Sequence, residues 1–288
     1  MASYLVIAAM RVVGLLPLRV VRALGWLLGM LLYGLVKSRR RVVLTNLRLC
    51  FPQWSEAHIQ RVAKEHFVYF GKAWLDRAWL WHGTPAMTLK RLRITGAVHE
   101  IQGDEPTVLF CPHFVGLDAC WIAFTQQMTR QWTTLYTNQA NPVMDAWILK
   151  SRQRYGNGRL FGRIDGVKTI VASMRAGEPF IILPDMNYGV HESVFVPFYG
   201  VSACTVPSLP RFARLGQAKV VPLVNRMTPQ GYDVEIHPHW ENYPTKDPVA
   251  DTALMNKRLE ALIDTMPAQY YWVHKRFKSR PPGEPEVY

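Results

Sequence analysis

His113 and Asp118 are the two side chains whose type and spacing most clearly offer catalytic chemistry. They lie in the stretch Val108-Leu109-Phe110-Cys111-Pro112-His113-Phe114-Val115-Gly116-Leu117-Asp118. Its apolar start is typical of a buried strand, and Pro112 and Gly116 predict a turn before a helix begins. On one continuous helix, two residues five apart would point about 140° away from each other. The pair can therefore meet only because a turn separates the strand from the helix.

An imidazole beside a carboxylate is suited to general base catalysis. A carboxylate that accepts a hydrogen bond from one ring nitrogen leaves the other nitrogen free to take a proton from a substrate hydroxyl. The chain has no Gly-x-Ser-x-Gly elbow to supply a nucleophilic serine. Direct attack of an acceptor hydroxyl on an activated acyl group is the favoured chemistry. The spacing alone also fits a structural role, in which Asp118 caps the helix and His113 is a turn residue.

The remainder of the chain alternates short strand patterns with helical patterns. Strands are predicted at residues 107–111, 132–137, 180–183, 219–223 and 232–236. Helices are predicted near 55–82, 118–129, 142–155, 166–176, 207–216 and 249–265. This alternation predicts an α/β fold with a mainly parallel central sheet flanked by helices. His113 would then lie at the carboxyl end of a strand, where open α/β sheets bind their ligands.

The N-terminal segment has the composition of a membrane anchor. From Tyr4 to Val36 the chain is strongly apolar, although arginines interrupt it, and its longest clean run is the 14 residues 23–36. A transmembrane helix needs about 20 apolar residues, so an interfacial or re-entrant helix is favoured over a crossing. A basic cluster follows at Lys37, Arg39, Arg40 and Arg41. We therefore predict an N-terminal anchoring helix with a basic flank in residues 1–41 and a folded domain in residues 42–288.

Two other interpretations of this segment are weighed against the anchor. A signal peptide would also be apolar and basic, but the positive charges lie within and after the apolar run, and no Ala-x-Ala cleavage site closes it. A buried first helix of a soluble domain would leave Arg19 and Arg22 in need of partners in a core. The basic residues after the run favour the cytoplasmic side of a bilayer.

The net charge and the cysteine content limit which molecules and metal ions the protein is expected to bind. With 34 Lys and Arg against 21 Asp and Glu, the formal net charge is +13, which favours an anionic partner such as a phospholipid, a phosphorylated glycolipid or an acidic carrier protein. No nucleic-acid-binding motif is present, so nucleic acid is not expected. The four cysteines contain no Cys-x-x-Cys pair, which disfavours a zinc site or a disulfide framework.

Several motifs, taken in order along the chain, resemble those of one known family. Besides the His113 to Asp118 stretch they are Arg152-Gln153-Arg154-Tyr155-Gly156, Asp165-Gly166-Val167, Leu183-Pro184-Asp185, Glu192-Ser193-Val194-Phe195-Val196-Pro197-Phe198-Tyr199-Gly200 and Gln269-Tyr270-Tyr271-Trp272-Val273-His274-Lys275-Arg276-Phe277-Lys278. Together they resemble the lipid A late (secondary) acyltransferases of the glycerolipid acyltransferase superfamily. The resemblance implies an acyl carrier protein thioester as donor and a hydroxyl on an acyl chain of a lipid A precursor as acceptor. It also implies no metal, no cofactor, and the cytoplasmic face of a bacterial inner membrane.

The same resemblance assigns roles to individual residues. His113 would be the general base and Asp118 its orienting partner. Charged positions that support the site or bind substrate would be Arg154, Asp185, Arg163 and Glu192. The resemblance also implies that residues 42–288 are an acyltransferase domain. The chain departs from many family members in having Asp rather than Glu at Asp118, and Asp185-Met186-Asn187 where Asp-Gln is common.

Other functions remain open at this point. The same dyad could acylate a lysophospholipid, an ornithine lipid or a mannosylated glycolipid, and acceptor profiling would separate these. A non-catalytic membrane-binding protein that kept the fold would use the basic and aromatic residues for anchoring alone. A hydrolase would release free fatty acid. The basic C-terminal stretch, with Lys275, Arg276, Lys278 and Arg280, could recruit the anionic substrates or could be a solvated end.

Overall fold

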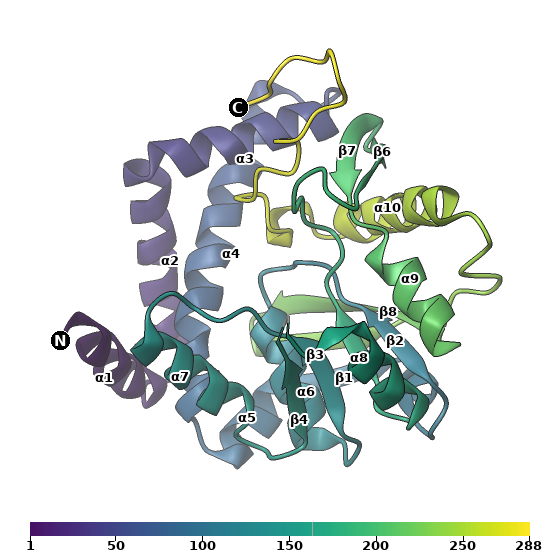
Figure 1. The fold of residues 1–288 in the computed structure, drawn as a ribbon. Helices are drawn as coiled ribbons and strands as arrows, with labels where there is room; N and C mark the ends of the chain where they lie inside the picture. Colours follow the sequence, from purple (N-terminus) through teal and green to yellow (C-terminus); the bar gives the residue numbers. More distant parts are fainter. Residues whose placement is uncertain (163) are drawn as a thin grey trace.

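A seven-stranded sheet forms the centre of the molecule (Figure 1). The computed structural model describes residues 1–162 and 164–288. The order across the sheet is β1 (Leu92–Gly96), β9 (Gly231–Ile236), β8 (Lys219–Thr228), β2 (Thr107–Phe110), β5 (Phe180–Ile182), β3 (Trp132–Leu135) and β4 (Gly158–Phe161). Neighbouring strands in this described sheet are parallel, except that β8 and β9 are antiparallel. The chain thus has the mainly parallel α/β fold predicted from the strand and helix alternation.

Helices flank this sheet at the positions that the sequence predicted, within three residues. They are α4 (Glu56–His82), α6 (Leu117–Gln127), α7 (Pro142–Arg152), α8 (Gly166–Arg175), α9 (Ser208–Gly216) and α10 (Pro248–Asp264). Capping side chains fix several starts: Ser55 accepts a hydrogen bond from the His58 amide, and Asn141 and Asp247 each cap a helix whose first residue is proline.

Several short elements were not predicted. They are α5 (Pro85–Arg91), β1, β4, and an antiparallel hairpin of β6 (Val194–Phe198) and β7 (Val201–Thr205), with single-turn 3-10 helices at Val98–Ile101 and Pro267–Gln269. The hairpin turns at Tyr199 and Gly200, whose φ angles are 50° and 75°. The missed strands are only four or five residues long, and β1 and β4 are partly exposed edge strands without regular alternation.

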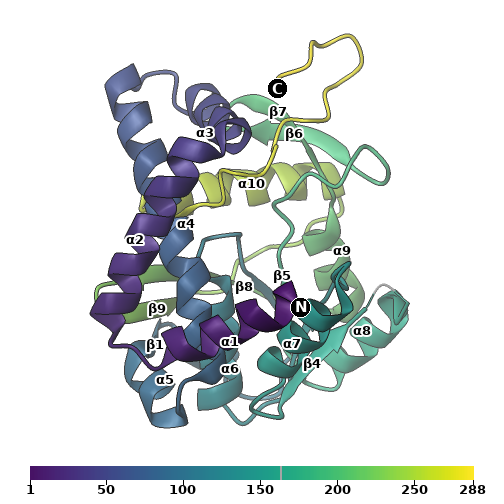
Figure 2. The same cartoon turned by 90° about the vertical axis from the view of Figure 1, so that its left-hand side faces the viewer.

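The apolar N-terminal segment forms two helices rather than the one predicted. They are α1 (Ala2–Gly14) and α2 (Leu18–Leu35), separated at Pro17, and the basic cluster opens a third helix, α3 (Lys37–Cys50). By length and composition, α2 is the helix in the described chain that could cross a membrane. Figure 2 shows α2 running beside α4, with α1 passing across the lower part of α4 toward α7.

Close backbone packing joins α2 to α4. A Cβ atom added to Gly29 would lie 2.3 Å from the Phe67 carbonyl oxygen, and one added to Gly71 would lie 2.4 Å from the Gly25 carbonyl oxygen. Glycine on both helices therefore lets their backbones touch, as in other small-residue helix contacts. The buried side of α2 is thus packed directly on α4.

A buried polar network fixes the first turns of α2 to the sheet. The Arg22 guanidinium lies 2.9 Å from the Asp76 carboxylate and donates to the Thr228 and Gly231 carbonyls. Asp76 also accepts hydrogen bonds from the Tyr232 hydroxyl at 2.7 Å and from the Trp79 indole at 2.8 Å. Arg22, which is partly buried, thus has an anionic partner and two carbonyl acceptors.

Candidate active site

His113 lies in a loop held between two parts of the chain. The loop follows β2 and ends where α6 begins at Leu117. The Tyr271 amide donates to the His113 carbonyl at 2.9 Å, and the Val115 amide donates to the Gln269 carbonyl at 2.9 Å. Between these two hydrogen bonds, Phe114 and Tyr270 form an isolated antiparallel β-bridge. The C-terminal segment therefore fixes the backbone around His113.

The partner of the His113 ring is Asp185. His113 Nδ1 lies 2.7 Å from Asp185 Oδ1, and the His113 amide donates to Oδ2 at 3.0 Å. The Tyr270 hydroxyl donates to the same Oδ2 at 3.0 Å. Asp185 follows β5, which pairs in parallel with β2 so that Phe110 lies beside Ile182. Because the carboxyl ends of parallel neighbours meet at one edge of the sheet, the pairing of β2 and β5 brings the two side chains together.

The surroundings of Asp185 keep it ionised and fix the His113 tautomer. Its side chain is fully buried. Burial raises the pKa of Asp185, but the charge of His113 and the hydrogen bonds from its ring and amide outweigh this and lower the pKa below its ordinary value. An ionised carboxylate only accepts hydrogen bonds, so Nδ1 carries the proton. In the neutral imidazole Nε2 then has the free lone pair that a general base requires.

Asp118 was expected to orient the His113 ring through a hydrogen bond. The structure, which describes both residues, does not have this hydrogen bond. The Asp118 carboxylate instead lies 2.7 Å from Arg77 Nε and 3.0 Å from Arg152 Nη2. Asp118 is in the first turn of α6, which directs it toward α4 and α7 and away from the Asp185 side of the loop. Burial raises its pKa, but the two guanidinium groups outweigh this and lower the pKa to about 2.

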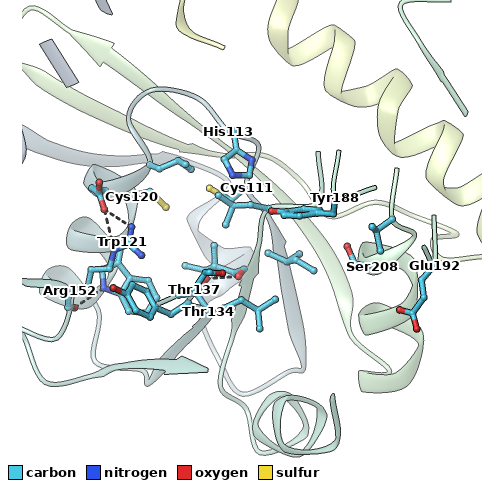
Figure 3. Close-up of a pocket in the computed structure, with 18 residues that line it drawn as sticks. Cys111, His113, Cys120, Trp121, Thr134, Thr137, Arg152, Tyr188, Glu192 and Ser208 are labelled. Atoms are coloured by element: carbon cyan, nitrogen blue, oxygen red, sulfur yellow. Dashed lines mark hydrogen bonds and ion pairs between the residues drawn. The ribbon is translucent and has the colours of Figure 1, made fainter. Parts of the chain in front are cut away.

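Both His113 and Asp118 nevertheless line one cavity of about 610 Å³ at the carboxyl ends of the strands (Figure 3). Its walls combine apolar and polar groups, and they include Cys111, Leu117, Trp121, Thr134, Leu135, Tyr136, Arg152, Ile181, Ile182, Leu183, Tyr188, Glu192 and Ser208. Figure 3 shows His113 and Arg152 on different sides of this cavity. An apolar chain with a polar reacting group near His113 would suit such a lining.

Comparison with known proteins identifies the family of the chain. The chain matches the family described as bacterial lipid A biosynthesis acyltransferase over residues 1–279. This chain belongs to that family. It is 30% identical to the lipid A biosynthesis lauroyltransferase of Escherichia coli, covering 99% of this chain and 94% of that protein. It is 31% identical to the E. coli myristoyltransferase, covering 99% and 90%.

A further relative and one solved structure complete these comparisons. A lipid A biosynthesis acyltransferase of Haemophilus influenzae is 30% identical, covering 93% of this chain and 85% of that protein. The crystal structure of the 1-acyl-sn-glycerophosphate acyltransferase PlsC from Thermotoga maritima aligns with a TM-score of 0.39 at 13% identity, covering 84% and 97%. The family of the chain, and its class as an acyltransferase, rest on the match along the whole sequence.

The other residues that were predicted to support the site or bind substrate do not all lie near His113. The Arg154 guanidinium donates to the Leu80 and Gly83 carbonyls at 2.6 and 2.7 Å, where it binds free carbonyls at the end of α4. Arg154 does not line the described cavity around His113. Glu192 does line it, from an exposed position 3.6 Å from Arg211. The prediction for Arg163 concerns a residue outside the described ranges 1–162 and 164–288.

Three functional candidates in the acyltransferase were missed by sequence reasoning. Arg152 lies in the motif Arg152-Gln153-Arg154-Tyr155-Gly156, but the family resemblance favoured Arg154 of this motif as the functional residue. Tyr270 lies in the quoted C-terminal motif and could have been found from it. Arg77 had no signal, because its importance depends on α4 passing beside the start of α6. Among the described residues no cluster of three His, Cys, Asp or Glu side chains is placed to bind a metal ion.

Proposed function

We propose that this lipid A acyltransferase moves a fatty acyl chain from the thioester of acyl carrier protein to a hydroxyl on an acyl chain of a lipid A precursor. His113 is the general base in this proposal. The observation that carries it is the His113–Asp185 hydrogen bond, which leaves Nε2 as the acceptor at the edge of a cavity whose walls combine apolar and polar side chains. The family of the chain supports lipid A as the acceptor.

The reaction can be written from these groups. His113 Nε2 takes the proton of the acceptor hydroxyl while its oxygen attacks the thioester carbonyl carbon. The carbon–sulfur bond then breaks, and the imidazolium returns the proton to the leaving thiolate. The ester and the free thiol are the products. Ionised Asp185 stabilises the positive imidazolium that exists between these two proton transfers.

The same proposal assigns the N-terminal residues 1–41 to membrane anchoring at the cytoplasmic face. Large apolar side chains are exposed along α1 and α2, at Tyr4, Leu5, Val12, Leu15, Val20, Leu24, Trp26, Leu27, Leu31 and Leu35. We name these residues the apolar row. The opposite side of α2 is fixed to α4 and carries Arg22 on Asp76. A helix with one apolar side free and one side on a folded domain suits the interfacial plane of a bilayer better than a crossing.

An acyl transfer assay tests the reaction. Membranes that contain the intact enzyme receive acyl carrier protein with a labelled acyl chain and a tetra-acylated lipid A precursor. We expect labelled ester in the lipid product, and its loss by about a thousandfold in His113→Ala, since general base catalysis and positioning both disappear. His99→Ala is the matched control, because His99 is highly exposed and lies away from the cavity.

The results separate the alternatives. Transfer to a lysophospholipid but not to the lipid A precursor would contradict the proposed acceptor. Release of free fatty acid without any ester product would indicate a hydrolase. Equal activity of His113→Ala and the intact enzyme would contradict the proposed base.

A further inference from the structure

A second cavity, of about 330 Å³, lies between the α2–α3 corner, α4 and the C-terminal segment. We call it the corner groove. Its lining is mainly apolar and consists of Leu32, Val36, Arg39, Phe67, Phe70, Tyr271, Val273 and His274. Figure 1 shows the C-terminal segment, in yellow, passing close to α3 and α4. The corner groove thus combines walls from the N-terminal helices and from the segment that holds the His113 loop.

Tyr271 connects the corner groove to the catalytic base. It lines the groove, its ring centroid is 6.2 Å from that of His113, and its amide donates to the His113 carbonyl at 2.9 Å. On its other side it packs on Phe70, at a centroid distance of 6.0 Å. His113 also lines the larger strand-end cavity. The imidazole therefore lines the strand-end cavity, and the neighbouring Tyr271 ring lines the corner groove.

The outer wall of the corner groove is continuous with the apolar row. Leu32, Val36 and Arg39 follow one another at spacings of four and three residues and line the groove. Leu31 and Leu35 alternate with them and are 50% and 77% exposed. The same stretch of helix therefore presents one side to the groove and the other to the surface that we assign to lipid. A lipid chain could enter the groove from the bilayer by lateral movement alone.

Basic side chains lie where such a lipid would place its headgroup. Arg39 lines the groove and is exposed, while its Nη1 donates to the Val273 carbonyl at 3.3 Å. Lys37 and Arg41 on α3 and Lys275 on the C-terminal segment are also exposed. Cations beside an apolar groove match an amphiphile that carries an anionic headgroup and hydrocarbon chains.

From these contacts we infer that the corner groove binds the acyl chain of the phosphorylated glycolipid acceptor that bears the reacting hydroxyl, while the strand-end cavity holds the chain being transferred. The inference rests on the proposed function, in which two chain-bearing substrates must meet at one base. The acceptor is a membrane lipid, so the cavity with a wall beside the apolar row is assigned to it. The donor is carried on a water-soluble protein and is assigned to the cavity at the strand ends.

Neighbouring tryptophan substitutions test this assignment through kinetics. Leu32→Trp places a large side chain on the groove wall, and Leu31→Trp places the same side chain on the exposed side of the same helix turn. We expect the KM for the lipid acceptor to rise about tenfold in Leu32→Trp, as when a few methylenes can no longer be buried. The KM for the acyl donor should stay within about twofold in both variants. A rise in donor KM, or equal acceptor KM values in the two variants, would overturn the inference.

Chemical modification repeats the test in a protein that has already folded. The four natural cysteines are buried, so Val36→Cys and its exposed neighbour Leu35→Cys introduce the sites for a methyl or an octyl thiosulfonate. The octyl group on residue 36 should raise the acceptor KM, and the methyl group should change it little. Inhibition by the octyl group at residue 35 alone would contradict the assignment.

Crosslinking distinguishes a failed inference from a failed proposed function. A lipid A precursor with a diazirine on its hydroxyacyl chain is irradiated with the intact enzyme in the absence of donor. Labels on Phe70 or Tyr271 would support the corner groove as its binding site, whether or not transfer is later observed. Labels on Leu135 or Ile181 of the strand-end cavity would overturn the inference. Absence of ester product in the transfer assay would instead contradict the proposed function.

Discussion

Asp185 and Asp118 are two carboxylates on either side of the His113 loop, and they have different types of partner. Asp185 accepts hydrogen bonds from the ring and amide of His113 and from the Tyr270 hydroxyl. Asp118 is held by the guanidinium groups of Arg77 and Arg152. Both carboxylates are buried. One is paired with a group that can gain and lose a proton, and the other with groups that stay charged at every accessible pH.

The two carboxylates should therefore have different roles: Asp185 orients the proposed base, and Asp118 organises the cavity wall. In the proposed mechanism Asp185 fixes the tautomer of His113 and stabilises its protonated form, so loss of Asp185 should act on the chemical step. Asp118 joins α4, α6 and α7 through two arginines, one of which lines the strand-end cavity. Its loss should act by displacing Arg152 and by leaving two cations without their shared anion.

The largest expected effect comes from Asp185→Asn. The amide can no longer hold the proton on Nδ1 in the same way, nor stabilise the imidazolium, so kcat should fall by about 10³- to 10⁴-fold. Single-turnover transfer of a labelled acyl group measures this directly. Tyr270→Phe is the control, because it keeps the carboxylate and removes one hydrogen bond, and we expect a loss of only about tenfold. A kcat for Asp185→Asn within tenfold of the intact enzyme would contradict the role of Asp185.

Asp118→Asn should have a smaller effect of a different kind. The asparagine amide cannot neutralise both Arg77 and Arg152, so we expect kcat/KM to fall by about 30- to 100-fold. Asp118→Glu is the matched control, since it keeps the negative charge, and it should retain most activity. A loss as large as that of Asp185→Asn would show that Asp118 serves the base after all.

Sequence reasoning paired His113 with Asp118, whereas in the structure the His113 ring contacts Asp185. The apolar run, Pro112 and Gly116 correctly placed His113 between a strand and a helix. A spacing of five residues could not reveal where Asp118 points, because that depends on the arginines contributed by α4 and α7. The contact with Asp185 depends on β5 lying next to β2, which is a property of sheet order and not of local sequence.

The N-terminal segment shows the same limit. Its apolar character was evident, and Arg22 was recognised as a residue that would need a partner in a folded core. That partner, Asp76, is 54 residues further along the chain. The division into α1 and α2 could have been predicted from Pro17, because proline favours the start of a helix and interrupts one that continues through it. The contact of Gly25 and Gly29 with Gly71 could not have been predicted, because the sequence does not show which part of the chain a glycine in an apolar helix will contact.

The smallest expected effect is a difference in acid stability that depends on Asp118. Its folded-state pKa of about 2 is below the value of about 3.9 expected in the unfolded chain. The carboxylate therefore stabilises the fold fully above about pH 4, and this stabilisation disappears as the pH falls toward 2, when the folded state must also take up the proton. The contribution should be roughly 2 to 3 kcal/mol in the free energy of unfolding.

Urea unfolding of the detergent-solubilised enzyme between pH 7 and pH 2.5 measures this contribution as a difference between variants. Other carboxylates, such as Glu100, also have a pKa lowered to about 2, against the effect of burial, by His239 and Lys219, so the intact enzyme alone does not isolate one group. The gap between the intact enzyme and Asp118→Asn should be widest near neutral pH and should narrow below pH 4. Asp104→Asn, at an exposed aspartate in the loop before β2, is the control and should run parallel to the intact enzyme. A gap that stays constant down to pH 2.5 would mean that Asp118 stabilises the fold through its shape and not through its charge.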